Sequence, residues 1–261
     1  MSTKIIVLGS SGATGKEALS TALASPSVAS VFSFGRRSPP VDNLAGANKL
    51  THATLDFDKL LLGTGNPEYE AEAKKLREVE ADAVLIALGT TRKNAGSAEA
   101  FEKIDREYVV KAAEAARIEG KKQRLVYLSS ASSNSSSSFL YVRSKGLTEE
   151  ALAGLGYTET VIARPGYLDV PGGRGESRIL ETGFGRPSGD RKVMGLLSNF
   201  SDRVKIETPV LGKALVHAAI TTGSLTKWGH AETLKGSALI GVNNAQLLKL
   251  GNATENDVNK A

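Results

Sequence analysis

Short apolar runs alternate with amphipathic segments over the first two thirds of the chain. The run at residues 4–8 is almost wholly apolar, which is typical of a strand buried on both faces of a parallel sheet. Between such runs, apolar residues recur at helical spacing, as at Phe101, Ile104 and Tyr108. The strands predicted from this pattern cover residues 4–8, 31–34, 52–57, 83–88, 125–128 and 160–163.

This alternation predicts the fold class. Strand and helix follow one another at intervals of about 20–35 residues, which is within the reach of strand–helix–strand units. Such units build a parallel sheet with helices on both faces. We therefore predict an α/β fold, a Rossmann-like doubly wound parallel sheet with a small carboxy-terminal substrate-side region. The prediction is one domain over residues 1–261, with a core at 1–170 and the substrate-side region at 171–261.

The regular alternation breaks after residue 170. Residues 171–189 are rich in glycine, arginine and proline, which indicates a loop over the site. Pro209 favours a helix that begins near it, because proline suits the first turn. The elements predicted here are a helix at 208–220, a strand at 237–242 and a frayed tail from residue 251.

The composition excludes several kinds of site and partner. The chain has no cysteine, which excludes disulfides and thiolate zinc sites. His52, His217 and His230 lie far apart without the spacing of metal ligands, so we expect no metal site. The net charge of +5 is spread without a polybasic run, so we expect no nucleic-acid partner.

The hydropathy of the chain bears on its location. No apolar run approaches the roughly 18 residues that span a bilayer, so no transmembrane segment is expected. The first predicted strand begins at Lys4 and leaves no room for a cleaved signal. We therefore expect a cytoplasmic protein.

Three glycines lie between the first predicted strand and the helix that follows it, with the spacing Gly9-x-x-Gly12-x-x-Gly15. Glycines let the backbone approach a pyrophosphate, which then lies at the amino end of the helix. We therefore predict a dinucleotide site over this turn, with an ordinary tight turn as the alternative. The other residues assigned to it are Ser11, Ala13 and Thr14.

The end of the second predicted strand indicates which dinucleotide binds. A carboxylate about 20 residues beyond the glycines would bind the ribose 2′-hydroxyl of NAD. Arg36 and Arg37 occupy that region instead, and guanidinium groups suit a phosphate. We therefore predict NADPH/NADP as the cofactor; the alternative is two solvated arginines at a strand end.

A candidate acid lies after the fifth predicted strand. Tyr141 and Lys145 are four residues apart and share one face of a predicted helix. A positive charge beside a phenol stabilises the phenolate, so the phenol can give up a proton near neutral pH. Ser129 or Ser130, at the end of the preceding strand, can hold a substrate carbonyl, and we favour Ser130.

Together these motifs and Arg164-Pro165-Gly166 resemble an atypical short-chain dehydrogenase/reductase. The segments LGTTRKNAG, KIDREYV, FLYVRSKG and ARPGYL are similar to those of the Tat-interacting-protein group, which includes a fungal protein of the mitochondrial proteome. The resemblance covers residues 4–170 well and the remainder loosely. It implies the fold of the extended reductases and NADPH binding.

The resemblance also implies roles for single residues. Lys145 would bind the nicotinamide ribose. Asp105 departs from the group, because relatives with full reductase activity often carry asparagine in the long helix, and this leaves a proton relay open. The remaining implied contacts are Asp56 and Phe57 at the adenine, Leu88 and Gly89 at the adjacent ribose, Thr90 elsewhere on the cofactor, and Pro165, Gly166, Tyr167 and Leu168 at the nicotinamide.

These observations predict an NADPH-dependent carbonyl reductase that acts on a small aldehyde or ketone, with Ser130, Tyr141 and Lys145 as catalytic residues. An NADPH-binding regulatory or scaffold protein with little turnover is the alternative, and an epimerase or dehydratase is a third reading. Tyr167, Phe184 and Phe200 are candidates for the substrate pocket.

The sequence leaves the oligomeric state and the location of the protein open. The predicted helices at residues 97–119 and 139–154 can pair between subunits or pack on the sheet, so monomer and dimer are both compatible. The resemblance to the fungal group implies peripheral attachment to the mitochondrial outer membrane as an alternative to a cytoplasmic location.

Overall fold

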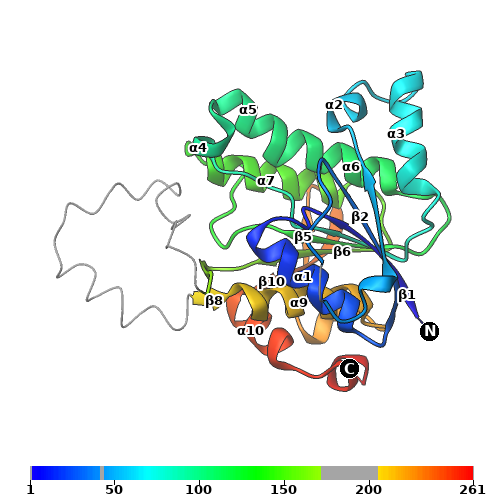
Figure 1. The fold of residues 1–261 in the computed structure, drawn as a ribbon. Helices are drawn as coiled ribbons and strands as arrows, with labels where there is room; N and C mark the ends of the chain where they lie inside the picture. Colours follow the sequence, from blue (N-terminus) through cyan, green and yellow to red (C-terminus); the bar gives the residue numbers. More distant parts are fainter. Residues whose placement is uncertain (1, 42–43, 172–204, 261) are drawn as a thin grey trace.

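The computed structural model describes residues 2–41, 44–171 and 205–260. Its main sheet contains β1 (Thr3–Leu8), β2 (Val28–Gly35), β3 (Leu50–Thr54), β4 (Ala83–Ile86), β5 (Arg124–Leu128), β6 (Glu159–Arg164), β9 (His230–Leu234) and β10 (Ser237–Asn243). The strand order is β3-β2-β1-β4-β5-β6-β10-β9 (Figure 1). Only the pairing of β9 with β10 is antiparallel among these described strands. The strand order runs outward from β1 to β3 and then continues on the other side of β1, beginning with β4. This change in strand order confirms the predicted doubly wound fold.

Two layers of helices cover the sheet (Figure 1). One face is covered by α1 (Ala13–Ala24), α9 (Thr208–Ile220) and α10 (Asn244–Asn252). The other face is covered by α3 (Pro67–Arg77), α6 (Tyr108–Ala116) and α7 (Leu140–Ala153).

Strand β1 shows why the predicted strands are almost wholly apolar. Ile5 and Val7 belong to the core beneath α1 and α9, whereas Ile6 and Leu8 belong to the core beneath α3, α6 and α7. All four side chains are fully buried. Successive side chains of a strand point to opposite faces, so a strand covered on both sides needs an apolar residue at each position.

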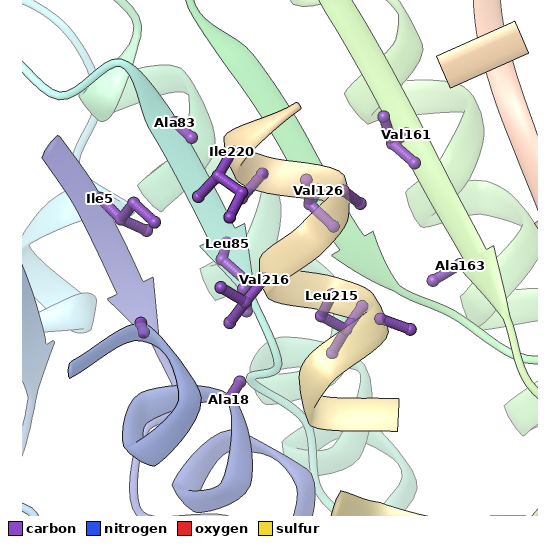
Figure 2. Close-up of a cluster of buried hydrophobic side chains, with 14 of the residues drawn as sticks. Ile5, Ala18, Ala83, Leu85, Val126, Val161, Ala163, Leu215, Val216 and Ile220 are labelled. Carbon is purple, nitrogen blue, oxygen red and sulfur yellow. The ribbon is translucent and has the colours of Figure 1, made fainter. Parts of the chain in front are cut away.

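Helix α9 packs directly on the sheet and on α1. Figure 2 shows Leu215, Val216 and Ile220 of α9 lying over the strands in one buried cluster. A Cβ at Gly212 would lie 2.8 Å from the backbone nitrogen of Ala18, so glycine permits this close approach. The division at residue 170 stays a prediction, but α9 and β10 add to the same core as the first strands.

The smaller elements lie mostly at the edges of this core. Strand β7 pairs in parallel with β8 in a separate two-stranded sheet. The remaining described elements are α2 (Phe57–Leu60), α4 (Arg92–Ala95), α5 (Ala98–Glu102), a π-helical turn (Lys103–Glu107), β7 (Tyr167–Asp169), β8 (Lys205–Glu207), α11 (Glu255–Asn259) and two 3₁₀ turns (Ala47–Lys49 and Leu225–Lys227).

The structure corrects the expectations for the third strand, for one edge of the sheet and for the tail. The third strand ends at Thr54 and not at residue 57, because the Asp56 side chain accepts hydrogen bonds from the amides of Asp58 and Lys59 and caps α2. Edge strand β9 was not predicted, since its side chains are mostly exposed and lack an apolar run. The tail was expected to fray, but α11 buries Val258 in the core.

Two further features bear on the expectations. Residues 172–189 of the loop predicted at 171–189 lie outside the described residues, as do Phe184 and Phe200. In the described ranges, no helix is both long and apolar enough to cross a bilayer, and no three side chains of metal-binding type cluster together.

Candidate active site

The carboxyl ends of four parallel strands meet at one edge of the sheet. The pairing places Leu8 of β1 beside Ile86 of β4, and Leu128 of β5 beside Ala163 of β6. The segments that follow these strands therefore lie next to one another, at the position where doubly wound folds bind ligands. The cleft here is lined by residues 87–89, 128–132 and 165–168 together with Tyr141 and Lys145.

The glycine turn has the form that a pyrophosphate requires. Gly9 has φ of +86°, and a Cβ on it would lie 2.5 Å from the Leu88 backbone nitrogen. A Cβ on Gly15 would meet the Gly9 carbonyl oxygen, so glycine is required for α1 to approach the strand. Helix α1 begins after Gly12 without a side-chain cap and without an acidic residue in its first turn. Its first amide groups can therefore bind an anion, and the turn fits a dinucleotide.

The two candidate phosphate-binding arginines lie at the same edge. Leu8 pairs with Phe34, so the residues after Gly35 emerge beside the glycine turn. Arg36 and Arg37 are both exposed, and neither makes an ion pair with another described residue. Ser10 in the turn shares a 2.6 Å hydrogen bond with Ser33 of β2, which ties the turn to the arginine-bearing strand.

Asp56 and Phe57, the residues implied at the adenine, have structural contacts of their own. The Asp56 carboxylate caps α2, as described above. The Phe57 ring is buried and stacks on Tyr108 with the ring centroids 5.2 Å apart.

The two serines after β5 have different partners. Ser129 is buried and donates a short hydrogen bond to Glu149 of α7. Ser130 is half-buried, lines the cleft, and its hydroxyl lies 3.1 Å from that of Ser132. Both serines line the cleft, and the Ser130 hydroxyl differs in that no buried carboxylate of the described residues engages it.

The serine-rich loop is held against α7. The Asn134 amide donates to the Val142 carbonyl at 3.1 Å, and the Ser135 hydroxyl donates to Glu150 at 2.5 Å. A Cβ at Gly146 would lie 2.2 Å from the Ser135 backbone nitrogen, so glycine at this position permits the contact. These contacts fix the loop against the helix that carries Tyr141.

Lys145 lies at the centre of a buried cluster. Its ammonium group is 3.0 Å from the Tyr127 hydroxyl and 3.3 Å from Asp105 Oδ1. It also lies 6.0 Å from the centroid of the Tyr141 ring. Burial by itself would lower the pKa of Lys145, but the facing Asp105 carboxylate and the nearby phenols raise it above its ordinary value. Lys145 is therefore charged at neutral pH.

Asp105 lies in the π-helical turn between α5 and α6. It is almost fully buried, its Oδ1 accepts a 3.4 Å hydrogen bond from the Thr90 amide, and its Oδ2 has no described partner. A Cβ at Gly89 would lie 2.8 Å from Asp105 Oδ1, so this glycine leaves room for the carboxylate. π-Helical turns are frequent at functional sites.

Tyr127 is a member of this cluster that sequence reasoning missed. It lies in a continuous apolar strand, where a tyrosine is expected to be a core residue, so no local signal in the sequence indicates that it contacts Lys145. Its hydroxyl is fully buried, and burial raises its pKa although the Lys145 ammonium opposes the shift. Tyr127 therefore stays a neutral hydrogen-bond partner of Lys145.

A second ionic cluster lies one helical turn further along α7. Arg164 donates to both oxygens of buried Glu149, the closest contact being 2.7 Å, and to both oxygens of Glu232 on β9 at 2.7 and 2.9 Å. Burial opposes ionisation of Glu232, but the hydrogen bonds from Arg164 outweigh it and lower the Glu232 pKa. His230 adds a 2.5 Å contact to Glu232. This cluster joins α7 to β6 and β9.

The segment implied at the nicotinamide is fixed from both sides. The Pro165 carbonyl accepts a 2.9 Å hydrogen bond from the Ala131 amide, and the Gly166 amide donates to Asn244 at 2.9 Å. Tyr167 and Leu168 continue into β7 and line the cleft.

The chain is similar to several known proteins, although no protein-family model matches it. The protein FMP52 of Emericella nidulans is 33% identical over 217 residues, which are 83% of this chain and 87% of that protein. The protein HTATIP2 of Rattus norvegicus is 35% identical over 237 residues, which are 90% of this chain and 87% of that protein. A short-chain dehydrogenase/reductase of Saccharomyces cerevisiae has a similar fold, with a TM-score of 0.63 and 13% identity, and the match covers 93% of this chain and 96% of that one.

These relatives correct one expectation and establish the family. The FMP52 proteins of Candida albicans, Emericella nidulans and Lodderomyces elongisporus are named mitochondrial, so the expectation of a cytoplasmic protein is wrong. The resemblance to the Tat-interacting-protein group is confirmed. The chain belongs to the family of FMP52 and HTATIP2, and it has the fold of the NAD(P)-dependent short-chain dehydrogenases/reductases.

Proposed function

We propose that this protein is an NADPH-dependent carbonyl reductase that reduces an aldehyde or ketone. The observation that supports this most is the cleft in which Ser130, Tyr141 and Lys145 meet. The same cleft is bordered by Gly89 and by Pro165, beside the glycine turn. A hydroxyl donor, a phenol and a buried ammonium group at a dinucleotide site are the groups that carbonyl reduction requires.

The residues at the sheet edge fit a nicotinamide dinucleotide. The uncapped start of α1 and the glycine turn would hold the pyrophosphate. Arg36 and Arg37 would bind a 2′-phosphate, which is why we propose NADPH over NADH. When bound, the reduced nicotinamide supplies the hydride.

The side chains of the cleft then bind the carbonyl and supply the proton. The Ser130 hydroxyl donates a hydrogen bond to the carbonyl oxygen and holds it near Tyr141. As negative charge develops on that oxygen, the Tyr141 hydroxyl transfers its proton to it. The Lys145 ammonium stabilises the phenolate that remains, and Asp105 and Tyr127 hold the ammonium in place.

The location of the protein and the rest of its substrate pocket are also proposals. The names of the fungal relatives support a mitochondrial location. The carboxy-terminal segments next to Tyr167 would contribute to the substrate pocket, while monomer and dimer both stay compatible with the described fold.

The experiment that tests this function is Tyr141→Phe. The variant should reduce turnover of a panel of aldehydes by about a thousandfold, because the proton donor is lost. NADPH binding, measured by fluorescence titration, should persist, and the wild-type protein should consume NADPH faster than NADH. Tyr157→Phe is a matched control, because it removes a phenolic hydroxyl that instead donates to the Ala113 carbonyl at 2.7 Å.

Two outcomes would contradict the proposal. Full turnover in Tyr141→Phe would remove the assigned acid. Tight NADPH binding without turnover of any carbonyl in the wild-type protein would instead favour the regulatory alternative.

A further inference from the structure

A second depression borders the active-site cleft on the outer side of Tyr141. It lies between α4, α5 and the start of α7, which are neighbours in Figure 1. Its lining includes Arg92, Lys93, Phe101, Phe139 and Tyr141. Because Tyr141 lines both hollows, one ligand can touch its side chain and extend into the depression.

Two cationic side chains line this depression, and neither has a carboxylate partner among the described residues. Arg92 and Lys93 are both exposed, and neither forms an ion pair with another described residue. Glu99 lies within electrostatic range of Arg92 but makes no hydrogen bond to it. This differs from other described cations nearby, since Lys103 pairs with Asp58 at 2.6 Å. Two unpaired cations beside a hollow favour an anionic ligand group.

Most of the remaining lining is aromatic, and Gly96 and Leu140 complete it. Phe139 is 51% exposed, and among the large apolar side chains of the described residues only Leu62 is comparably exposed. Phe101 is buried and lies tilted against the Tyr141 ring, with the ring centroids 6.2 Å apart. The exposed Phe139 ring would stabilise an apolar or aromatic ligand body by contact with it, and Phe101 would support the Tyr141 ring from behind.

We propose that the substrate is an aldehyde or ketone that carries an anionic group, such as a carboxylate, on an apolar or aromatic body. Its carbonyl lies at Ser130 and Tyr141, its body lies against Phe139, and its anionic group binds Arg92 and Lys93. This inference rests on the proposed reductase function and names the substrate class of the same site.

The test compares two aldehydes of similar size, 4-carboxybenzaldehyde and 4-methylbenzaldehyde. In the wild-type protein, kcat/KM should favour the carboxylated aldehyde. In Arg92→Gln/Lys93→Gln, the ratio of the two kcat/KM values should fall about tenfold, which corresponds to the loss of one charge-assisted interaction. Lys122→Gln is the matched control, because it removes an exposed lysine beyond the opposite end of β5 and should keep the ratio.

A binding arm separates this inference from the proposed function. The non-reducible probe 4-methylbenzoate, followed by NMR titration, should bind the wild-type protein and lose about tenfold in affinity in the double variant. If no aldehyde is turned over and that loss still occurs, the reductase function fails but the anion site stands. An unchanged kcat/KM ratio with unchanged benzoate affinity would overturn the inference. Weaker NADPH binding with unchanged benzoate affinity would also overturn it, since the cations would then belong to the cofactor site.

Discussion

Helix α7 carries two buried charged residues one turn apart, and their surroundings differ. Lys145 faces Asp105 and Tyr127, whereas Glu149 faces Arg164 and Ser129. Both charges are at least 95% removed from solvent, at 5% and 3% exposure. Such charges persist in a protein only when partners replace the lost water.

The two clusters differ in how completely they are paired. Glu149 has partners on both oxygens, and Arg164 extends the network to Glu232. In the other cluster, Asp105 Oδ2 is buried without a described partner, and Lys145 borders the cleft. A saturated network joins structural elements, whereas an unsaturated one keeps hydrogen-bonding capacity for a ligand or a proton. We infer that the Glu149 cluster maintains the fold and the Lys145 cluster serves the reaction.

The largest expected effect comes from breaking the saturated cluster. Arg164→Leu should lower the free energy of unfolding by about 3–5 kcal/mol, because buried Glu149 loses its charged partner. Urea unfolding followed by circular dichroism measures this loss. Arg77→Leu is the control, since Arg77 pairs with Glu70 at an exposed position, and it should cost about 1 kcal/mol or less. A loss for Arg164→Leu as small as the control would show that the cluster does not hold the fold together.

Asp105→Asn should have a smaller effect on stability and a distinct effect on the pH dependence of turnover. The amide keeps an acceptor for Lys145 but removes its buried counter-charge, so the unfolding free energy should fall by about 2 kcal/mol. Burial lowers the pKa of Lys145 and Asp105 raises it, so without the carboxylate the ammonium loses its proton at lower pH. The alkaline limb of the kcat profile should therefore move towards lower pH.

The control for this shift is Asp58→Asn, which removes a mostly exposed carboxylate that pairs with Lys103. That variant should keep the pH profile of the wild-type protein. A profile that stays in place in Asp105→Asn would mean that Asp105 does not set the charge state in the cleft.

The smallest expected effect lies at the outer end of the saturated cluster. Glu232→Gln should cost about 1 kcal/mol at pH 7, because Glu232 is partly exposed and Arg164 keeps Glu149. The Glu232 pKa is lowered in the folded protein, so its contribution is present above the ordinary value of 4.5 and fades as pH falls through the lowered pKa. Urea unfolding at pH 7 and pH 3 should show this difference shrink. A difference that persists at pH 3 would assign it to packing and not to charge.

Much of the fold could be predicted because its strands are buried on both faces. The almost wholly apolar runs at β1, β4 and β5 are explained by that burial, and no other local arrangement accounts for them as simply. Edge strand β9 has solvent on much of its surface and carries no such run. Helix α11 begins with a capping box formed by Thr254 and Asp257, a local signal that could have identified it.

In the candidate site, too, some residues could be predicted from local sequence and others could not. Tyr141 and Lys145 follow from their spacing on a helix, and the glycine turn follows from its place after a strand. Tyr127 and Glu149 could not be recognised, because a buried strand tyrosine and a helical glutamate are ordinary in sequence. Their roles come from partners 18 and 15 residues away, which only the packing of β5, α7 and β6 brings together.

The sequence by itself determined the doubly wound core, the glycine turn and the helix that carries Tyr141 and Lys145, because each depends on local periodicity or spacing. Only the tertiary structure showed that Glu149 engages the Ser129 hydroxyl and not the Ser130 hydroxyl, and placed Asp105 against Lys145. The physical reason is that the charge and hydrogen bonding of a buried group depend on its neighbours in space, and those neighbours come from separate strands and helices.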